Sequence, residues 1–456
     1  MRYQGRDGLR AVAIRSLTVA ALFVSGAALF VSGAFAADRA STSYAAAKLI
    51  LAAHRDQLPA ELRNPEESKW LAWSRREDRA IRARLAQGDL DSVVNLLLYG
   101  TSFTKQPRIR MEALTEASKS GLLRARVDDL VAGIRNPGEN ERLLFVQHLV
   151  RNQGIDPDSS EAGRFLYNNL LRVIKERREL VSRARKAAPA SLLDRASLFD
   201  NRGVSLDTGI IADFSIDQTL RDLKQRGVLR EGQIGRVAVV GPGLDFADKN
   251  EDSAYDYYPE QTVQPFAIFD SLIRLGLAKT NEISLSVLDI SPRVIEHVEQ
   301  ARERARKNRG YVLQLPRDAG RPWPEDLIAY WRSFGDRIGS TVSPIRPPDI
   351  FPGLETRAIE VRPQVVLACE PLDLDIILQR LDKTFDLIVA TNIFVYYDAF
   401  EQSLALENAG AMLNPGGLLL TNDSLPAVPG GSMRLGGVIK ASLDAVGWYV
   451  NSPRAR

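Results

Sequence analysis

Short apolar runs in the second half of the chain, each followed at once by turn or polar residues, constrain the fold most. The runs lie at 236–240, 283–288, 385–390 and 418–421. Segments with helical periodicity alternate with them, at about 215–226, 261–277, 292–308 and 400–412. Alternation of buried strands with helices is typical of βαβ units. We therefore predict an α/β domain with a mostly parallel, doubly wound, Rossmann-like sheet covered by helices on both faces.

The first half of the chain has helical patterns and no alternating β-branched run. Asn64-Pro65-Glu66-Glu67 predicts a helix start near residue 66, and Gly88 predicts the end of that helix. A capping box at Asp158–Glu161 opens a second helix over about 161–187. Its basic outer face also carries acids, which is typical of a solvated helix. We predict an all-α domain preceding the sheet domain.

The first 36 residues are typical of an export signal. Four arginines precede a run without charge from Ser16 to Ala37, and Ala34-Phe35-Ala36 fits a small-x-small cleavage site. If uncleaved, the same run is long enough to anchor the chain in a membrane. Either way the remainder is exported to the periplasm or envelope, and the membrane is contacted only through this segment. If the true start lies downstream, the chain is cytoplasmic instead.

The expected organisation is then a signal peptide or anchor over 1–36, a helical domain over 37–204 and a Rossmann-like domain over 205–456. Two insertions enlarge the last domain, at about 245–262 and 310–360. The first holds six acids and three tyrosines, which indicates either an acidic, aromatic lid suited to a cationic acceptor or a solvated loop. The second is rich in proline and aromatic residues and is expected to cover the sheet or an acceptor site.

Composition excludes several kinds of site. With 60 Lys+Arg against 57 Asp+Glu, the net charge of +3 is too small to indicate a nucleic-acid coat, and no specific nucleic-acid partner is predicted. Cys369 is the single cysteine and the chain has only three histidines, so an intrachain disulfide framework and a Cys-rich zinc site are excluded. We predict no metal site.

In a doubly wound sheet, ligands bind beyond the carboxyl ends of the strands. Gly241-Pro242-Gly243 follows the first strand and lets the backbone approach a nucleotide-like ligand closely. Phe246 replaces the third glycine of the dinucleotide fingerprint, which disfavours NAD and FAD. Asp289 ends the second strand, where an acid accepts both hydroxyls of a ribose. The alternative is that Asp289 only caps the helix that begins at Ser291-Pro292.

Four motifs in this order resemble those of the class I S-adenosylmethionine-dependent methyltransferases, over roughly residues 205–425. The motifs are Val237–Gly243, Val287–Asp289, Phe385–Asn392 and Leu413–Leu420. The stretch Asn392–Asp398 is also similar to that of the chemotaxis-receptor glutamate methyltransferases, without fixing the substrate. The resemblance implies S-adenosyl-L-methionine as cofactor and direct methyl transfer to an unknown acceptor, either a small molecule or a protein side chain.

The resemblance also implies site residues. Those implied in cofactor binding are Gly241, Pro242, Gly243, Asp245, Asp289, Ile290, Glu370, Pro371, Asn392 and Phe394. Glu370 would lie near the adenine edge, with Asp373 as a competing assignment, and Asn392 and Phe394 would approach the sulfonium. Methyl transfer mainly requires donor and acceptor to be held in line. The catalytic candidates for positioning or proton removal are Asn392, Tyr396, Tyr397 and Asp398, although the tyrosines have an alternative role as packing residues.

Two alternatives stay open. Val239 stands where the family has an acid, two residues before the first glycine, and Asp245 is only conjectured to replace its cofactor contact. One alternative is therefore a non-catalytic envelope interaction protein that retains the fold. The other is an aminopropyltransferase-like enzyme, whose glycine turn this one also resembles. A ligand-sized pocket beside Gly241 and Asp289 would favour an enzyme, and a filled pocket would favour the non-catalytic alternative.

Overall fold

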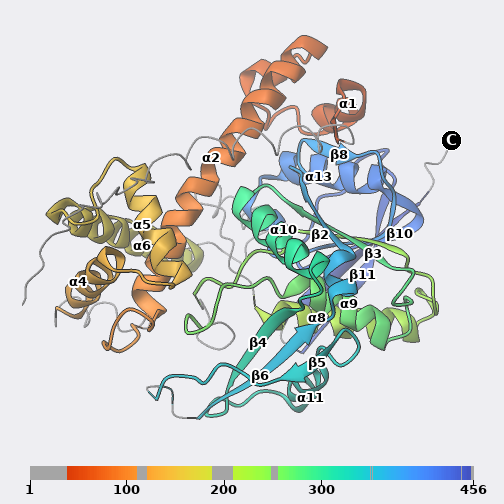
Figure 1. Cartoon of the computed structure of the whole chain (residues 1–456). Coiled ribbons are helices and arrows are strands. Elements are labelled where there is room, and N and C mark those ends of the chain that lie inside the picture. The colour runs from red at the N-terminus through yellow and green to blue at the C-terminus, as the bar shows by residue number, and fades with distance from the viewer. Residues whose placement is uncertain are drawn as a thin grey trace, which may run out of the picture. The chain divides into compact units, whose positions relative to one another are not determined.

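The computed structural model describes residues 39–109, 121–186, 209–247, 255–349, 351, 353–442 and 444–452 (Figure 1). The predicted signal or anchor and the predicted domain boundary at 204 lie outside the described residues. Residues 39–456 belong to one compact unit. Within the described ranges, no helix combines the length and the apolar character needed to cross a membrane.

A seven-stranded sheet forms the centre of this unit (Figure 1). Its spatial order is β11 (Met433–Lys440), β12 (Ala445–Asn451), β10 (Leu413–Thr421), β9 (Phe385–Ala390), β2 (Arg236–Val240), β3 (Ser284–Asp289) and β7 (Cys369–Asp373). Strands β10, β9, β2, β3 and β7 are parallel, and β12 is antiparallel to both its neighbours. In chain order, β2 is followed by β3 and β7, which lie on one side of it in the sheet. Strands β9 and β10 come later in the chain and lie on the other side of β2. This order puts a topological switch point between β2 and β9 and confirms the predicted doubly wound α/β sheet.

Helices cover both faces of the sheet because the strand side chains alternate between them. Val237 and Val239 share one core with α8 (Ile210–Gln225), α9 (Gln264–Arg274) and α10 (Pro292–Arg306). Ala238 and Val240 share a second core with α13 (Ala399–Met412), α1 (Tyr44–Ala53) and the start of α2 (Glu67–Tyr99). A short helical turn, η2 (Ala60–Leu62), connects α1 and α2. The chain before α1 also joins the sheet domain, because β1 (Arg39–Ser41) pairs with β8 (Gln379–Leu381).

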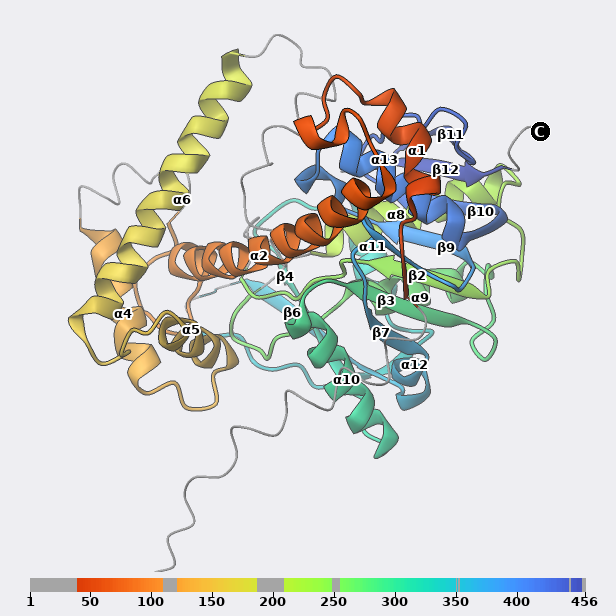
Figure 2. The same ribbon diagram turned by 90° about the horizontal axis from the view of Figure 1, so that it is seen from above.

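Helix α2 continues past Gly88, where the sequence predicted its end, so that prediction is wrong. Its last part, Val93–Tyr99, packs in a third core with three further helices. These are α4 (Leu122–Arg135), α5 (Glu141–Asn152) and α6 (Ser160–Lys186). This packing outweighs the cost of a glycine in a helix interior, about 1 kcal/mol. Figure 2 shows α2 running from α1 and α13 to α4 and α6, so one helix belongs to two cores.

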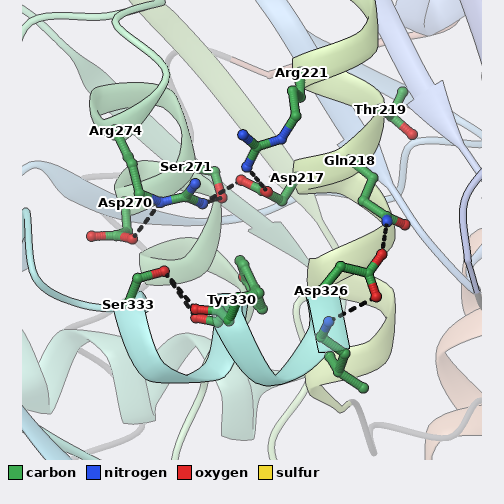
Figure 3. A network of polar contacts seen from close by, with 12 residues as sticks. Asp217, Gln218, Thr219, Arg221, Asp270, Ser271, Arg274, Asp326, Tyr330 and Ser333 are labelled. Carbon is green, nitrogen blue, oxygen red and sulfur yellow. Dashed lines mark hydrogen bonds and ion pairs between the residues drawn. The ribbon is translucent and has the colours of Figure 1, made fainter. Parts of the chain in front are cut away.

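The insertion predicted at about 310–360 folds into a small antiparallel sheet with a helix. The strands are β4 (Tyr311–Asp318), β6 (Leu354–Val361) and β5 (Gly339–Val342), and α11 (Glu325–Ser333) and α12 (Pro363–Leu367) complete the segment. Trp331 and Phe334 are buried in the core of α8 and α9. Figure 3 shows the polar side of this junction, where Gln218 of α8 donates to Asp326 of α11 at 2.7 Å and Arg274 of α9 pairs with Asp217. This insertion therefore covers α8 and α9.

The described part of the first insertion is bound to the helical region. Arg142 of α5 donates hydrogen bonds to the backbone carbonyls of Asp245 at 2.9 Å and Tyr258 at 2.5 Å, and to that of Phe246. The carboxylate of Asp256 accepts hydrogen bonds from the backbone N–H groups of Thr101 and Ser102, each at 2.7 Å. All of these residues except Ser102 are buried. The ends of this insertion are thus structural attachments, and residues 248–254, which hold three of the six acids of the predicted lid or solvated loop, lie outside the described residues.

Candidate functional site

A pocket lies at the carboxyl ends of β2, β3 and β7, beside the switch point where ligands bind in this class of sheet. Its lining residues are Val240, Gly241, Gly243, Leu288, Asp289, Ile290, Leu374, Asp375, Ile376, Ile393, Tyr396 and Tyr397. The pocket brings together the predicted glycine turn, Asp289 with Ile290, and residues 392–398, which we call the tyrosine loop. Six of its lining residues were missed by sequence reasoning, namely Val240, Leu288, Leu374, Asp375, Ile376 and Ile393.

The glycine turn has the conformation that its residues predict. Gly241 and Gly243 both lie in the left-handed region, with φ of +61° and +67°, which residues with a Cβ rarely adopt. The Gly241 N–H donates to the carbonyl of Leu288 at 2.7 Å, which fixes the turn to β3. A Cβ at position 241 would collide with Cδ1 of Ile393. Pro242 is buried and does not line the pocket.

Asp289 is both a capping residue and a pocket residue. Its Oδ1 accepts a hydrogen bond from the Ser291 N–H at 2.8 Å, whereas no described residue forms a hydrogen bond with Oδ2. The side chain is only 4% exposed, and burial raises its pKa to about 7 although backbone N–H groups act in the opposite direction. The two interpretations of Asp289 are therefore compatible, since one oxygen caps the helix and the other is available to a ligand.

Asp375 is a second acid of the same kind. It lies two residues beyond β7 and is 1% exposed, and burial raises its pKa to about 7. Its Oδ1 accepts a hydrogen bond from the Ile377 N–H at 3.0 Å, and Oδ2 lacks a hydrogen-bond partner within the described ranges. The signal for Asp375 was its place after the third parallel strand, the counterpart of Asp289 after the second. We call Asp289 and Asp375 the pocket acids.

Glu370, predicted near the adenine edge, and Pro371, predicted to bind the cofactor, do not line the pocket. The register of β7 on β3 pairs Glu370 with Ser286 and Pro371 with Val287, whereas Asp373 pairs with Asp289 at the carboxyl end. Glu370 forms an ion pair with Lys383 at 2.9 Å, and neither residue lines the pocket. Sequence reasoning placed the carboxyl end of this strand too early. Asp373, the competing assignment, forms ion pairs with Arg39 and Arg82, each at 2.9 Å.

Asp245, for which a cofactor contact was conjectured, forms its hydrogen bonds within the protein. Its Oδ1 accepts a hydrogen bond from the Gln261 N–H at 3.0 Å. Its Oδ2 accepts hydrogen bonds from the Gln261 side-chain amide at 2.7 Å and from the Tyr258 hydroxyl at 3.2 Å. Asp245 is buried, does not line the pocket, and has both carboxyl oxygens occupied within the protein.

Three predicted residues of the tyrosine loop have structural roles. Asn392, with φ of +58°, exchanges two hydrogen bonds of 2.7 Å with Asn422, and Phe394 is fully buried in the second core. Asp398 accepts a hydrogen bond from the Glu401 N–H at 2.8 Å and is the N-cap of α13 in a capping box. None of the three lines the pocket in this structure, and their predicted positions at the reacting centre stay predictions.

Tyr396 and Tyr397 do line the pocket. Tyr397 is also packed in the second core at 4% exposed, so it lines the pocket and packs beneath the loop at once. The Tyr396 carbonyl accepts a hydrogen bond from Nη2 of Arg84 at 2.7 Å. Gln402 donates hydrogen bonds of 3.0 Å to the carbonyls of Phe394 and Tyr397. The loop is thus held from α2 on one side and from α13 on the other.

The pocket is narrow. The space that water can enter measures about 40 Å³, whereas ligand pockets typically measure about 300–1,000 Å³. Such a space holds one or two waters but not a nucleoside. The side chain of Ile393, packed over Gly241, takes up the space next to the turn. A nucleoside-sized ligand therefore requires the tyrosine loop to move.

The site contains no evident nucleophile. Cys369 is fully buried, and burial raises the pKa of its thiol to about 12, which agrees with its predicted role in packing. Among the described residues no cluster of His, Cys, Asp and Glu side chains could hold a metal ion. The chemistry available in the pocket is therefore hydrogen-bond acceptance by the pocket acids in apolar surroundings.

Neither a protein-family model nor a curated protein matches the chain. Solved structures similar to it include the N-methyltransferase NodS from Bradyrhizobium japonicum, at 12% identity and a TM-score of 0.26, covering 53% of this chain and 97% of that one. A TehB-like methyltransferase from Corynebacterium glutamicum is similar at 11% identity and a TM-score of 0.24, covering 53% and 97%. Magnesium protoporphyrin IX methyltransferase from Synechocystis is similar at 11% identity and a TM-score of 0.24, covering 53% and 81%. All three are methyltransferases, as the sequence motifs lead one to expect, but similarity at this level does not assign the chain to their family.

Proposed function

We propose that the chain binds S-adenosyl-L-methionine in this pocket and is a methyltransferase. The observation that carries the proposal is the pair of pocket acids. Both acids line one pocket beside the glycine turn, and each has a buried carboxylate oxygen without a hydrogen-bond partner in the described part of the chain. A buried acceptor without a partner is costly, so the arrangement calls for a ligand that donates hydrogen bonds.

The donor groups of an adenosine ligand fit these acceptors. Oδ2 of Asp289 would accept hydrogen bonds from the ribose hydroxyls, and Oδ2 of Asp375 would accept one from the adenine amine. Ile290, Leu374 and Ile376 supply apolar surface for the base, and Gly241 and Gly243 allow close backbone approach. The sulfonium of the cofactor, when bound, supplies an activated methyl group.

The residues of the chain then have positioning roles. The pocket acids and the glycine turn orient the donor. Tyr396 and Tyr397 are the side chains of the loop that can contact an acceptor, which is an unknown small molecule or protein side chain. Because methyl transfer is a displacement at an activated carbon, orientation is the main contribution required of the protein.

Calorimetric titration with S-adenosylmethionine and S-adenosylhomocysteine tests the proposal. We expect Asp289→Asn and Asp375→Asn each to weaken binding about tenfold or more, since hydrogen bonds to a charged group contribute about 1.5–3 kcal/mol. Glu370→Gln is the matched control, because it removes an acid of β7 that lies outside the pocket. Absence of binding to folded wild-type chain at millimolar ligand would overturn the proposal.

The small cavity supports a second candidate, a non-catalytic protein that retains the fold. In that case the tyrosine loop fills the site permanently, and substitution of the pocket acids leaves the biological activity of the chain unchanged. A complementation assay with Asp289→Asn distinguishes the two candidates. Loss of biological activity in a folded variant would exclude the non-catalytic candidate.

Export of the chain remains a proposal that bears on this choice. S-adenosylmethionine is made and used inside cells, whereas residues 1–36 predict transfer out of the cytoplasm. Fractionation of cells that produce the full-length chain, followed by N-terminal sequencing of the product, tests both location and cleavage after Ala36. A cytoplasmic product that retains residues 1–36 would refute export.

A further inference from the structure

We propose that Arg84 of α2 is a positioning residue that latches the tyrosine loop over the glycine turn, and that Ile393 and Tyr396 form the gate through which the ligand enters. The proposal rests on the proposed function for the identity of the ligand. It assigns to the helical region, which sequence reasoning left without a role, control over access to the site.

The tyrosine loop has two fixed and two less buried side chains. Phe394 and Tyr397 are 0% and 4% exposed in the second core, and Gln402 of α13 holds both their carbonyls. Ile393 and Tyr396, which alternate with them, are only half-buried, and both line the pocket. The side chains of Ile393 and Tyr396 can therefore turn away from the pocket while Phe394 and Tyr397 stay in the second core.

Ile393 lies where the ligand must enter. Its Cδ1 occupies the position that a Cβ at Gly241 would require, so its contact with the turn depends on glycine at that position. With Ile393 in this place the pocket has about 40 Å³ of free space, although the glycine turn and the pocket acids surround it. The structure is thus the closed state of a site whose walls are already formed.

Arg84 holds this closed state from outside the loop. Its guanidinium donates a hydrogen bond to the Tyr396 carbonyl at 2.7 Å and lies 5.7 Å from the centre of the Tyr397 ring. The neighbouring Arg82 fixes α2 to the opposite rim through an ion pair with Asp373 at 2.9 Å and a hydrogen bond of 3.3 Å to the Ile290 carbonyl. Helix α2 therefore spans the mouth of the pocket, attached to β3 and β7 by Arg82 and to the loop by Arg84.

The contacts of Arg84 and Ile393 exist only when the loop is closed over the pocket. A ligand that binds the open state must first shift this equilibrium, and its apparent affinity is reduced by the fraction of molecules that are open. Replacing Arg84 or shortening the side chain of Ile393 should therefore increase the affinity for the ligand. A residue with a merely structural role would have the opposite effect or none.

The test compares Arg84→Gln and Ile393→Ala with Arg79→Gln, a control that removes an exposed arginine of the same helix. In the unliganded protein, we expect Arg84→Gln to accelerate hydrogen exchange at the Tyr396 and Tyr397 amides about tenfold, with no change in α13. Unchanged exchange at these two amides would overturn the latch. So would equal acceleration throughout α13, because that indicates general loosening.

Titration with S-adenosylhomocysteine then tests the gate. We expect Arg84→Gln and Ile393→Ala to bind it about tenfold more tightly than wild type, and Arg79→Gln to bind it equally. If wild type binds and neither variant binds more tightly, the gate is refuted while the proposed function stands. If no form binds, the proposed function fails, and the exchange measurement still decides whether Arg84 latches the loop.

Discussion

Two pairs of buried acids in the second half of the chain differ in their hydrogen-bond partners. Asp245 and Asp256, the bonded acids, receive hydrogen bonds on both carboxyl oxygens from within the protein. The pocket acids each have one such oxygen, and their Oδ2 atoms have no partner among the residues that the structure describes. All four are almost completely buried.

The comparison teaches that neither burial nor a perturbed pKa identifies the functional acids. Burial raises the pKa of Asp245 to about 8, slightly more than that of the pocket acids, although Asp245 contacts no ligand space. What distinguishes the pairs is where their acceptor capacity is used. The bonded acids use it to hold the chain together, and the pocket acids keep part of it for a ligand, at a cost to the free protein.

The largest expected effect is on stability, from Asp256. Asp256→Ala leaves the Thr101 and Ser102 N–H groups and the Thr101 hydroxyl without their acceptor in a buried site, so we expect a loss of about 3 kcal/mol of unfolding free energy. Urea denaturation measures the loss. A change below about 1 kcal/mol would show that Asp256 is not the attachment that the structure indicates.

A smaller loss of unfolding free energy is expected from Asp245→Asn. The Asn side chain places an N–H₂ donor where Asp245 Oδ2 accepts hydrogen bonds from Gln261 and Tyr258, so two donors oppose each other. We expect the unfolding free energy to fall by about 2 kcal/mol at pH 4, where neither the folded Asp245 carboxyl nor the Asn amide is charged and the opposed donors are the main difference. If this substitution left the unfolding free energy unchanged, Asp245 would behave like a pocket acid, and the distinction between bonded acids and pocket acids would fail.

The strands and turns could be predicted from sequence because their signals are local. The limits of β2 and β9 and the helix after Ser291 follow from patterns within a few residues, whereas β10 begins at Leu413, earlier than the predicted strand at 418–421. The capping box of Asp398 and Glu401 was equally local, so its structural role was available from the sequence. It was missed because the family resemblance was preferred.

The remaining features depend on contacts between distant segments. Asp375 reaches the pocket because β7 pairs with β3 in one register, and a different register would bring Glu370 there instead. Helix α2 passes Gly88 because α4–α6 bury its last turns. The closed pocket depends on Ile393 meeting Gly241, about 150 residues away in sequence.

The same Asp→Asn change should have the opposite sign at a pocket acid. The folded-state pKa of Asp375, about 7, lies above the ordinary value of 3.8, so the folded protein binds its proton more tightly than the unfolded chain. This group therefore lowers stability progressively as pH rises from about 4 to 7, and its full cost is present above that range. We expect Asp375→Asn to stabilise the unliganded chain by about 1–2 kcal/mol at pH 8 and by little at pH 4.

Denaturation at the two pH values, with wild type measured in parallel, checks this prediction. Asp289→Asn should behave alike, because burial raises its pKa to about 7 as well. A loss of stability at pH 8 in both variants would mean that their Oδ2 atoms have acceptor roles in the free protein, and the distinction between the two pairs of acids would fail.

The smallest effect is expected from Glu370→Gln, which tests the register on which the comparison depends. Glu370 lies on the same strand that leads to Asp375, but its ion pair with Lys383 is 45% exposed on the acid side. Exposed ion pairs contribute about 0–1 kcal/mol, so we expect a change within about 0.5 kcal/mol and no pH dependence beyond that of wild type. If Glu370→Gln instead reproduced the pH-dependent stabilisation expected of Asp375→Asn, β7 would be paired with β3 in a shifted register, and Glu370 would be the acid at the pocket.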